Sequence, residues 1–125
     1  MALPKKVILV VVVVLCSILG GVVAKADTTK DDTMLAGYYS DALEGRLTAS
    51  GEVYKKDSYT AAHQTLPFGT ILDVCYHGCA RVLINDRNPH SKADLDLSHA
   101  AADDIKLTPD GYGVVDTKVV GLAQP

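Results

Sequence analysis

The segment of residues 81–89, R-V-L-I-N-D-R-N-P, places an acidic side chain where a buried strand gives way to a loop. Val82, Leu83 and Ile84 are apolar or β-branched, as expected of a strand buried on both faces. The residues that follow are turn formers. Asp86 is therefore held by rigid structure and still open to a ligand. The segment alone leaves a second interpretation open, in which Asp86 is an ordinary turn residue paired with Arg87.

The N-terminus has the pattern of a secretory signal peptide. Two lysines precede an almost wholly apolar stretch at 7–19, and the sequence A-K-A at 24–26 supplies the small residues of a cleavage site. We predict a signal peptide at 1–26 and an exported mature chain, periplasmic or secreted, with no membrane anchor after cleavage. The alternative is a membrane anchor at 7–24, which is just long enough to span a bilayer.

The predicted mature chain is acidic and has room for one small domain. Cleavage leaves nine of the twelve basic residues and all fifteen acidic ones, so the net charge moves from −3 to −6. Such a surface argues against binding to a phosphate backbone, and we expect no nucleic-acid partner. A neutral glycan is compatible with it. Residues 27–33 are polar and predict a disordered leader, and the domain is expected at 34–121.

Two cysteines remain after cleavage, Cys75 and Cys79, and they flank a short loop that contains a glycine. Export places them in an oxidising compartment, so a disulfide at the end of a hairpin is the natural interpretation. A metal site that adds His63 and His77 is the weaker alternative. We expect no metal and no cofactor.

The remaining pattern is one of short strands with a single short helix. Ser98 is a suitable N-cap for a helix from 99 to about 105, which contains three consecutive alanines. No βαβ alternation and no repeat are visible. The pattern favours a mainly β fold that closes into a small barrel. The expected strands lie at 35–40, 71–75, 80–85, 94–98 and 114–120.

Four blocks in order along the chain resemble the rare lipoprotein A (RlpA-like) family. They are G-R-L-T-A-S-G-E-V-Y (45–54), T-A-A-H-Q-T-L-P-F-G-T (60–70), V-L-I-N-D-R-N-P (82–89) and D-L-S-H-A-A-A (96–102). Any one block is weak, but four at normal spacing are highly specific, and they cover residues 35 to about 121. The resemblance implies a six-stranded double-psi β-barrel with one or two short helices, related in shape to expansins.

The resemblance also implies an activity. Characterised members of the family are lytic transglycosylases that favour peptidoglycan glycan strands stripped of their stem peptides. Such an enzyme cleaves the β-1,4 bond between MurNAc and GlcNAc, and the 6-hydroxyl of MurNAc attacks to leave a 1,6-anhydro ring. One carboxyl group can then serve first as acid and afterwards as base. The family motif has glycine where this chain has Asn88, a residue able to adopt a positive φ in its place.

Carried over residue by residue, the resemblance gives Asp86 the acid/base role. Glu52 and His63 match family positions implicated in activity, and Glu52 is expected to act on Asp86 by like-charge repulsion. Tyr39, Arg87 and Thr48 are the expected sugar contacts. Each residue also has a structural interpretation: Glu52 as a solvated turn residue, His63 as a core histidine. Asp96 is expected to cap the helix or bind the barrel backbone, and His77, His90 and His99 to lie on the surface.

Three functions remain open from the sequence. The first is a monomeric lytic transglycosylase whose partner is the peptidoglycan glycan strand. The second is a noncatalytic, expansin-like barrel that binds glycan without cutting it. The third is an exported protein that uses the barrel for protein contacts, since a fold does not fix a function.

Overall fold

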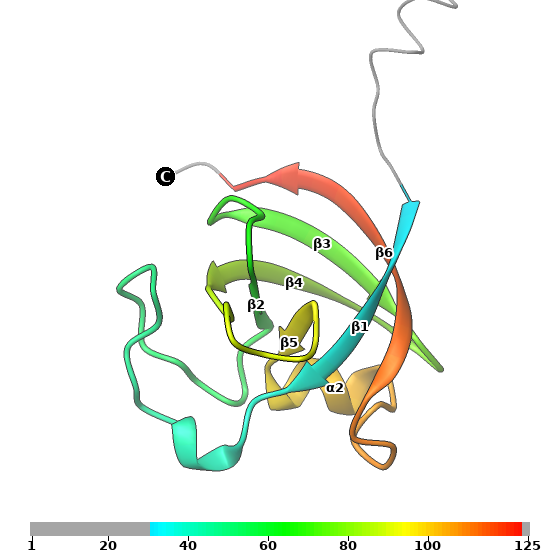
Figure 1. Ribbon diagram of the computed structural model, residues 1–125, viewed down its shortest axis with the longest axis horizontal. Coiled ribbons are helices and arrows are strands. Elements are labelled where there is room, and N and C mark those ends of the chain that lie inside the picture. Colours follow the sequence, from blue (N-terminus) through cyan, green and yellow to red (C-terminus); the bar gives the residue numbers. More distant parts are fainter. Residues whose placement is uncertain (1–30, 124–125) are drawn as a thin grey trace, which may run out of the picture.

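The computed structural model describes residues 31–123, which form a closed barrel of six strands with a short helix beside it (Figure 1). The predicted signal peptide and residues 27–30 of the predicted leader lie outside the described residues. Within 31–123, no helix is both long and apolar enough to cross a membrane. The elements are β1 (Asp31–Tyr38), η1 (Asp41–Leu43), β2 (Thr60–His63), β3 (Thr70–Cys75), β4 (Cys79–Asp86), β5 (Leu95–Leu97), α2 (His99–Asp104) and β6 (Gly113–Leu122).

The strand order around the barrel is β1-β5-β2-β4-β3-β6. Most neighbours are antiparallel, but β1 pairs with β5 in parallel and β2 pairs with β4 in parallel. Parallel neighbours cannot be joined by a tight hairpin, so the chain must cross the barrel between them. The predicted mainly β, closed-barrel fold is confirmed.

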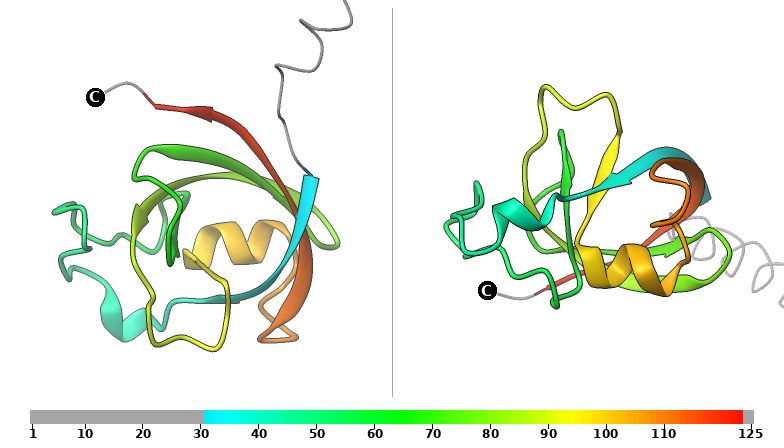
Figure 2. Two further views of the ribbon diagram at one scale, coloured as in Figure 1. Left: turned by 45° about the horizontal axis from the view of Figure 1, so that its top comes forward. Right: turned by 90° about the horizontal axis from the view of Figure 1, so that it is seen from below.

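Alternating side chains fill the barrel. Leu72 and Val74 of β3 are fully buried, as are Leu95 and Leu97 of β5, while their neighbours face outward. The helix α2 adds Ala101 and Ala102 to the same core and packs beside the barrel (Figure 2). Ser98 is its N-cap, as predicted: the Ser98 hydroxyl accepts a hydrogen bond from the Ala101 N–H.

The β3–β4 hairpin carries the predicted disulfide. Cys75 and Cys79 face each other in the strand register and are bonded through their sulfur atoms. Both sulfurs are committed to this bond, so the alternative of a cysteine-based metal site does not hold.

The barrel begins earlier than predicted. Asp31, Asp32 and Thr33 belong to β1 rather than to a disordered leader, because they pair with residues 116–118 of β6. Their side chains are exposed, so backbone pairing with a distant strand, and not local hydrophobicity, makes them a strand. At the other end β6 runs to Leu122, one residue beyond the predicted boundary.

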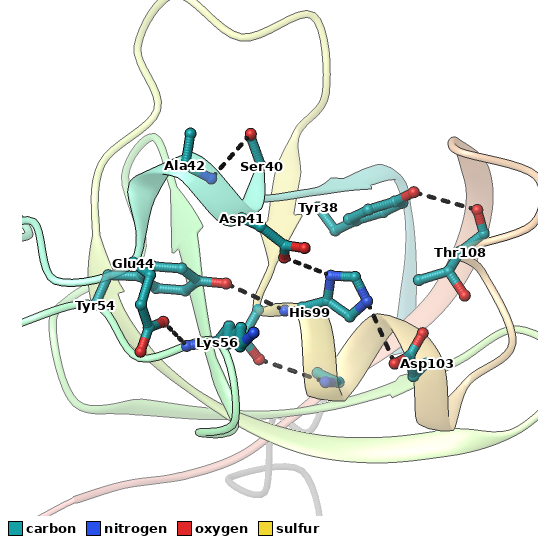
Figure 3. Close-up of polar contacts among 12 residues, drawn as sticks. Tyr38, Ser40, Asp41, Ala42, Glu44, Tyr54, Lys56, His99, Asp103 and Thr108 are labelled. Carbon is teal, nitrogen blue, oxygen red and sulfur yellow. Dashed lines mark hydrogen bonds and ion pairs between the residues drawn. The ribbon is translucent and has the colours of Figure 1, made fainter.

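Residues 44–59 form a long loop between η1 and β2, and hydrogen bonds attach this loop to α2 (Figure 3). The Tyr54 hydroxyl accepts a hydrogen bond from the His99 N–H, and the Lys56 carbonyl accepts one from Ala100. The His99 ring lies between two carboxylates, with Nδ1 3.0 Å from Asp41 and Nε2 3.4 Å from Asp103. His99, expected on the surface, is instead half-buried and ties η1 to the helix.

Candidate active site

Asp86 is the last residue of β4, and three donors hold its carboxylate. Oδ1 accepts hydrogen bonds from the backbone N–H groups of Ala49 and Arg87, both at 2.8 Å. Oδ2 accepts one from the Tyr39 hydroxyl. One oxygen is thus fixed by rigid backbone donors, whereas the other faces a hydroxyl that can either donate or accept.

Arg87 does not form the side-chain ion pair with Asp86 that the sequence left open. One guanidinium nitrogen donates to the backbone carbonyls of His63 and Asp86, each at 3.3 Å. The guanidinium also lies over the Phe68 ring, 4.1 Å from its centre. Arg87 therefore ties the end of β4 to the end of β2.

Tyr39 positions Asp86 and is itself held by stacking. Its ring lies on that of Tyr54, with centroids 4.3 Å apart and planes 15° from parallel. Burial, followed by the hydrogen bond to Asp86, raises the pKa of Tyr39 above its usual value, so the hydroxyl keeps its proton. Tyr39 lines both cavities beside Asp86 and its direct partner is the carboxylate; its role as a sugar contact stays a prediction.

Two adjacent cavities meet at Asp86. One, of about 290 Å³, is lined by Tyr38, Tyr39, Ser40, Leu43, Ala62, Asp86, Arg87, Asn88 and Asp96. The other, of about 180 Å³, is lined by Tyr39, Leu43, Arg46, Leu47, Thr48, Tyr54 and Asp86. A larger cavity of about 630 Å³ lies between β1, β3 and β6, away from Asp86. Asp86 therefore lies where two hollows join, which suits a group that acts on a bond between two sugars.

A second carboxylate, Asp96, lines the 290 Å³ cavity next to Asp86. Ala62 of β2 pairs with Asp86 of β4 on one side and with Asp96 of β5 on the other. Two strand spacings separate the two aspartates, about 9–10 Å between Cα atoms. Asp96 does not cap α2, since Ser98 does so. The L-D-L alternation on β5 was a signal for this placement, because the buried leucines turn the aspartate to the opposite face.

Asn88 braces the loop between the two aspartates. Its Nδ2 lies 2.8 Å from Asp96 Oδ2, 3.2 Å from the Ala93 carbonyl and 3.5 Å from the Asp94 carbonyl. These acceptors set the orientation of the amide. Its φ is not positive, so the expectation that Asn88 replaces a left-handed glycine is wrong. The side chain acts through hydrogen bonds instead.

His63 supports the site without touching Asp86. Its Nδ1 accepts hydrogen bonds from the N–H groups of Thr65 at 3.1 Å and Leu66 at 3.0 Å. Burial lowers the pKa of His63, partly offset by Asp94. Because Nδ1 accepts two N–H groups, the hydrogen of the neutral ring is on Nε2. Its geometry fits a residue that fixes the turn after β2 and, through its carbonyl, the guanidinium of Arg87.

The predicted residues Thr48 and Glu52 lie in a turn next to Asp86. The Thr48 hydroxyl donates to the Glu52 carbonyl at 2.8 Å and is 2.9 Å from the Ser50 hydroxyl. The Glu52 carboxylate is exposed, lies 3.4 Å from Ser50 Oγ, and lines a separate cavity of about 440 Å³. The structure thus joins Glu52 to Asp86 only through the turn whose Ala49 N–H holds Asp86.

Among residues 31–123, no group of three or more His, Cys, Asp or Glu side chains is arranged to hold a metal ion.

The closed six-stranded barrel, with its two parallel pairs, is a double-psi β-barrel. The chain belongs to the family described as "Lytic transglycolase", which matches residues 32–119. It is 45% identical over 94 residues to the "Endolytic peptidoglycan transglycosylase RlpA" of Haemophilus influenzae, covering 72% of this chain and 33% of that protein. The Helicobacter pylori (strain J99) protein of the same name is 36% identical over 102 residues, covering 78% of this chain and 32% of the relative. The chain thus spans about a third of the length of these curated relatives.

Solved structures share the fold. "Streptomyces papain inhibitor (SPI)" matches with a TM-score of 0.60 and 25% identity, over 74% of this chain and 96% of that one. A Clavibacter michiganensis expansin in complex with cellohexaose matches with a TM-score of 0.59 and 22% identity, over 77% of this chain and 54% of that one. These likenesses show the fold alone.

Proposed function

We propose that this protein is a lytic transglycosylase that cleaves the MurNAc–GlcNAc β-1,4 bond of peptidoglycan glycan strands, preferably denuded ones, and leaves a 1,6-anhydroMurNAc end. The observation that carries the proposal concerns Asp86, which lies where two cavities meet. Its Oδ1 accepts two backbone hydrogen bonds, whereas its Oδ2 accepts one, from the Tyr39 hydroxyl. Family membership supports the same reaction class.

Asp86 serves as acid and then as base. With Oδ1 fixed by two backbone donors, Oδ2 is the oxygen that carries the proton. That proton passes to the glycosidic oxygen as the bond to C1 of MurNAc breaks. The 6-hydroxyl oxygen of the same MurNAc then bonds to C1, and its proton returns to Asp86. No water is consumed, and the carboxyl group ends in its starting state.

Tyr39 and Asp96 assist this cycle. The Tyr39 hydroxyl donates to Oδ2 when Asp86 is ionised and can accept from it when Asp86 is protonated, so the pair persists in both states. Asp96, on the other side of Ala62, provides negative charge toward the positive charge that develops on the sugar ring. His63 and Glu52 act as positioning residues, through Arg87 and through the turn that carries Ala49.

We also propose that the chain is exported and acts as a monomer after its signal peptide is removed. The pattern of residues 1–26 supports export. The Cys75–Cys79 disulfide supports it independently, because such bonds persist in oxidising compartments.

Product analysis by mass spectrometry tests the function. Purified mature protein is incubated with denuded glycan strands, and the reducing ends are identified. Anhydro ends, which contain one water less than hydrolysed ends, are expected. Hydrolysed ends would make the protein a hydrolase. Binding without any product would favour the noncatalytic barrel.

A further inference from the structure

The three arginines of the described barrel differ in what their side chains contact. Arg81 pairs with Asp73 at 2.7 Å on the outer surface. The Arg87 guanidinium binds two backbone carbonyls and covers Phe68. Within residues 31–123, Arg46 makes no side-chain hydrogen bond or ion pair, although it lines the cavity that contains Asp86. A free guanidinium next to the proposed acid/base is a candidate binding group.

The backbone of Arg46 is fixed even though its side chain is free. The Arg46 N–H donates to the Leu43 carbonyl at 3.0 Å, and the Arg46 carbonyl accepts from the Tyr54 N–H at 2.7 Å. Tyr54 is in turn buried under Tyr39 and bound to α2. The Arg46 side chain therefore extends from a fixed backbone position beside Asp86, and the residue is exposed to solvent.

The chemistry of this cavity selects the ligand. Arg46 is the only cation in its lining, and the whole protein has a net negative charge. A planar guanidinium is matched to a carboxylate, which it binds through two parallel hydrogen bonds. In a peptidoglycan strand the sugar rings are neutral, and the carboxylate they carry is the 3-O-lactyl group of MurNAc. That carboxylate is free only where the stem peptide has been removed.

We infer that Arg46 binds the free lactyl carboxylate of a MurNAc residue next to the bond that Asp86 cleaves, and that it thereby selects denuded strands. The inference rests on the proposed function for the placement of the substrate. Arg46 is then a specificity-determining residue: a stem peptide converts the carboxylate to an amide, which removes the charge and adds bulk at the same position. Arg87 is less suited to this role, because its Nη1 already donates to two backbone carbonyls and one face of its guanidinium covers Phe68.

The test compares two glycans and three proteins. Denuded strands are used as such and after conversion of their lactyl carboxylates to neutral methylamides. The proteins are wild type, Arg46→Gln and Arg81→Gln. Arg81→Gln is the matched control. It removes the same charge from the first half of β4, about 16 Å along the strand from Asp86. Both binding and the rate of formation of anhydro ends are measured.

Wild type and Arg81→Gln should bind the free-carboxylate strands roughly ten-fold more tightly than the capped ones, the worth of one charge-assisted contact. Arg46→Gln should bind both preparations as weakly as wild type binds the capped one. Equal binding of the two preparations by wild type, or an undiminished preference in Arg46→Gln, would overturn the inference. Absence of anhydro ends from every preparation rejects the proposed activity alone, because the binding comparison still reports on Arg46.

Discussion

The hydroxyl of Tyr39 donates a hydrogen bond to Oδ2 of Asp86 while the Tyr39 ring stacks on Tyr54. The end of β1 and the end of β4 are joined by this contact. Tyr54 is fixed to α2 through His99. The orientation of the candidate acid/base therefore depends on residues from four separate segments, which gives a rigid support for a group that must be placed precisely.

Replacing Tyr39 with phenylalanine should lower the rate of glycan cleavage roughly ten- to a hundred-fold, the worth of one hydrogen bond to a charged group. The ring and its stacking on Tyr54 are retained, so the melting temperature should change little. Initial rates on denuded glycan measure the effect. Tyr59→Phe is the matched control, since its hydroxyl also donates to an aspartate, Asp104, away from the cavities. An equal loss in both variants would count against a role for Tyr39 at the site.

Asp86→Asn should abolish cleavage while the fold and glycan binding persist. The amide is nearly isosteric, its oxygen can keep the bonds from Ala49 and Arg87, and its nitrogen can donate to the Tyr39 hydroxyl. Losing the transferable proton should cost about 10²–10⁴-fold in turnover. Rates, glycan binding and melting temperature are measured together. Near wild-type activity in Asp86→Asn, combined with an inactive Asp96→Asn, would move the acid/base role to Asp96.

Local sequence signals were enough for some of the fold. The β3–β4 hairpin follows from two apolar strand segments on either side of a Cys-flanked glycine loop, and the helix follows from Ser98 as its N-cap. Strand pairing between segments far apart in the chain could not be predicted from local sequence. The polar residues 31–33 form a strand only because β6 lies beside them. The alanine-rich β2 is likewise a strand because β4 and β5 flank it.

Among the sequence candidates, Asp86, Tyr39, Arg87 and Thr48 line the two cavities, but their geometry could not be predicted from the sequence. The position of Asp86 at a strand end follows from the turn formers behind it. Its partner Tyr39 is 47 positions away, and only the closed barrel brings them together. The pairing of Asp86 and Asp96 across Ala62 likewise depends on strand order, which the sequence does not display. His63, which matches a family position implicated in activity, has its ring hydrogen-bonded to its own turn and not to Asp86.

The stability of the protein should fall in acid partly because of His63. Burial lowers the pKa of His63 in the folded state below its ordinary value of 6.5. The unfolded chain therefore takes up the proton first. Stability from this residue is full above about pH 6.5, falls as pH decreases through that value, and levels off below the lower folded pKa. Urea unfolding between pH 5 and 8 measures the slope.

His63→Asn separates this effect from other titrations. The asparagine Oδ1 can accept the hydrogen bonds of Thr65 and Leu66 in place of Nδ1, but the amide does not titrate. The pH dependence of stability should become flatter in this variant, with little change near pH 8. An unchanged slope would show that His63 does not contribute.

Asn88→Ala should destabilise the protein by about 1–3 kcal/mol, because it removes the hydrogen bonds that Nδ2 donates to the part-buried Asp96 carboxylate and Ala93 carbonyl. Asn88→Gly, which restores the glycine of the family motif, should be at least as destabilising. The φ of Asn88 is not positive, so glycine relieves no strain and adds backbone entropy to the unfolded chain. Asn88→Asp should be worst at neutral pH, since it sets a carboxylate against Asp96, and should recover in acid. Denaturant unfolding of the three variants gives the order, and a glycine variant more stable than wild type would show that backbone conformation, rather than the amide, governs this turn.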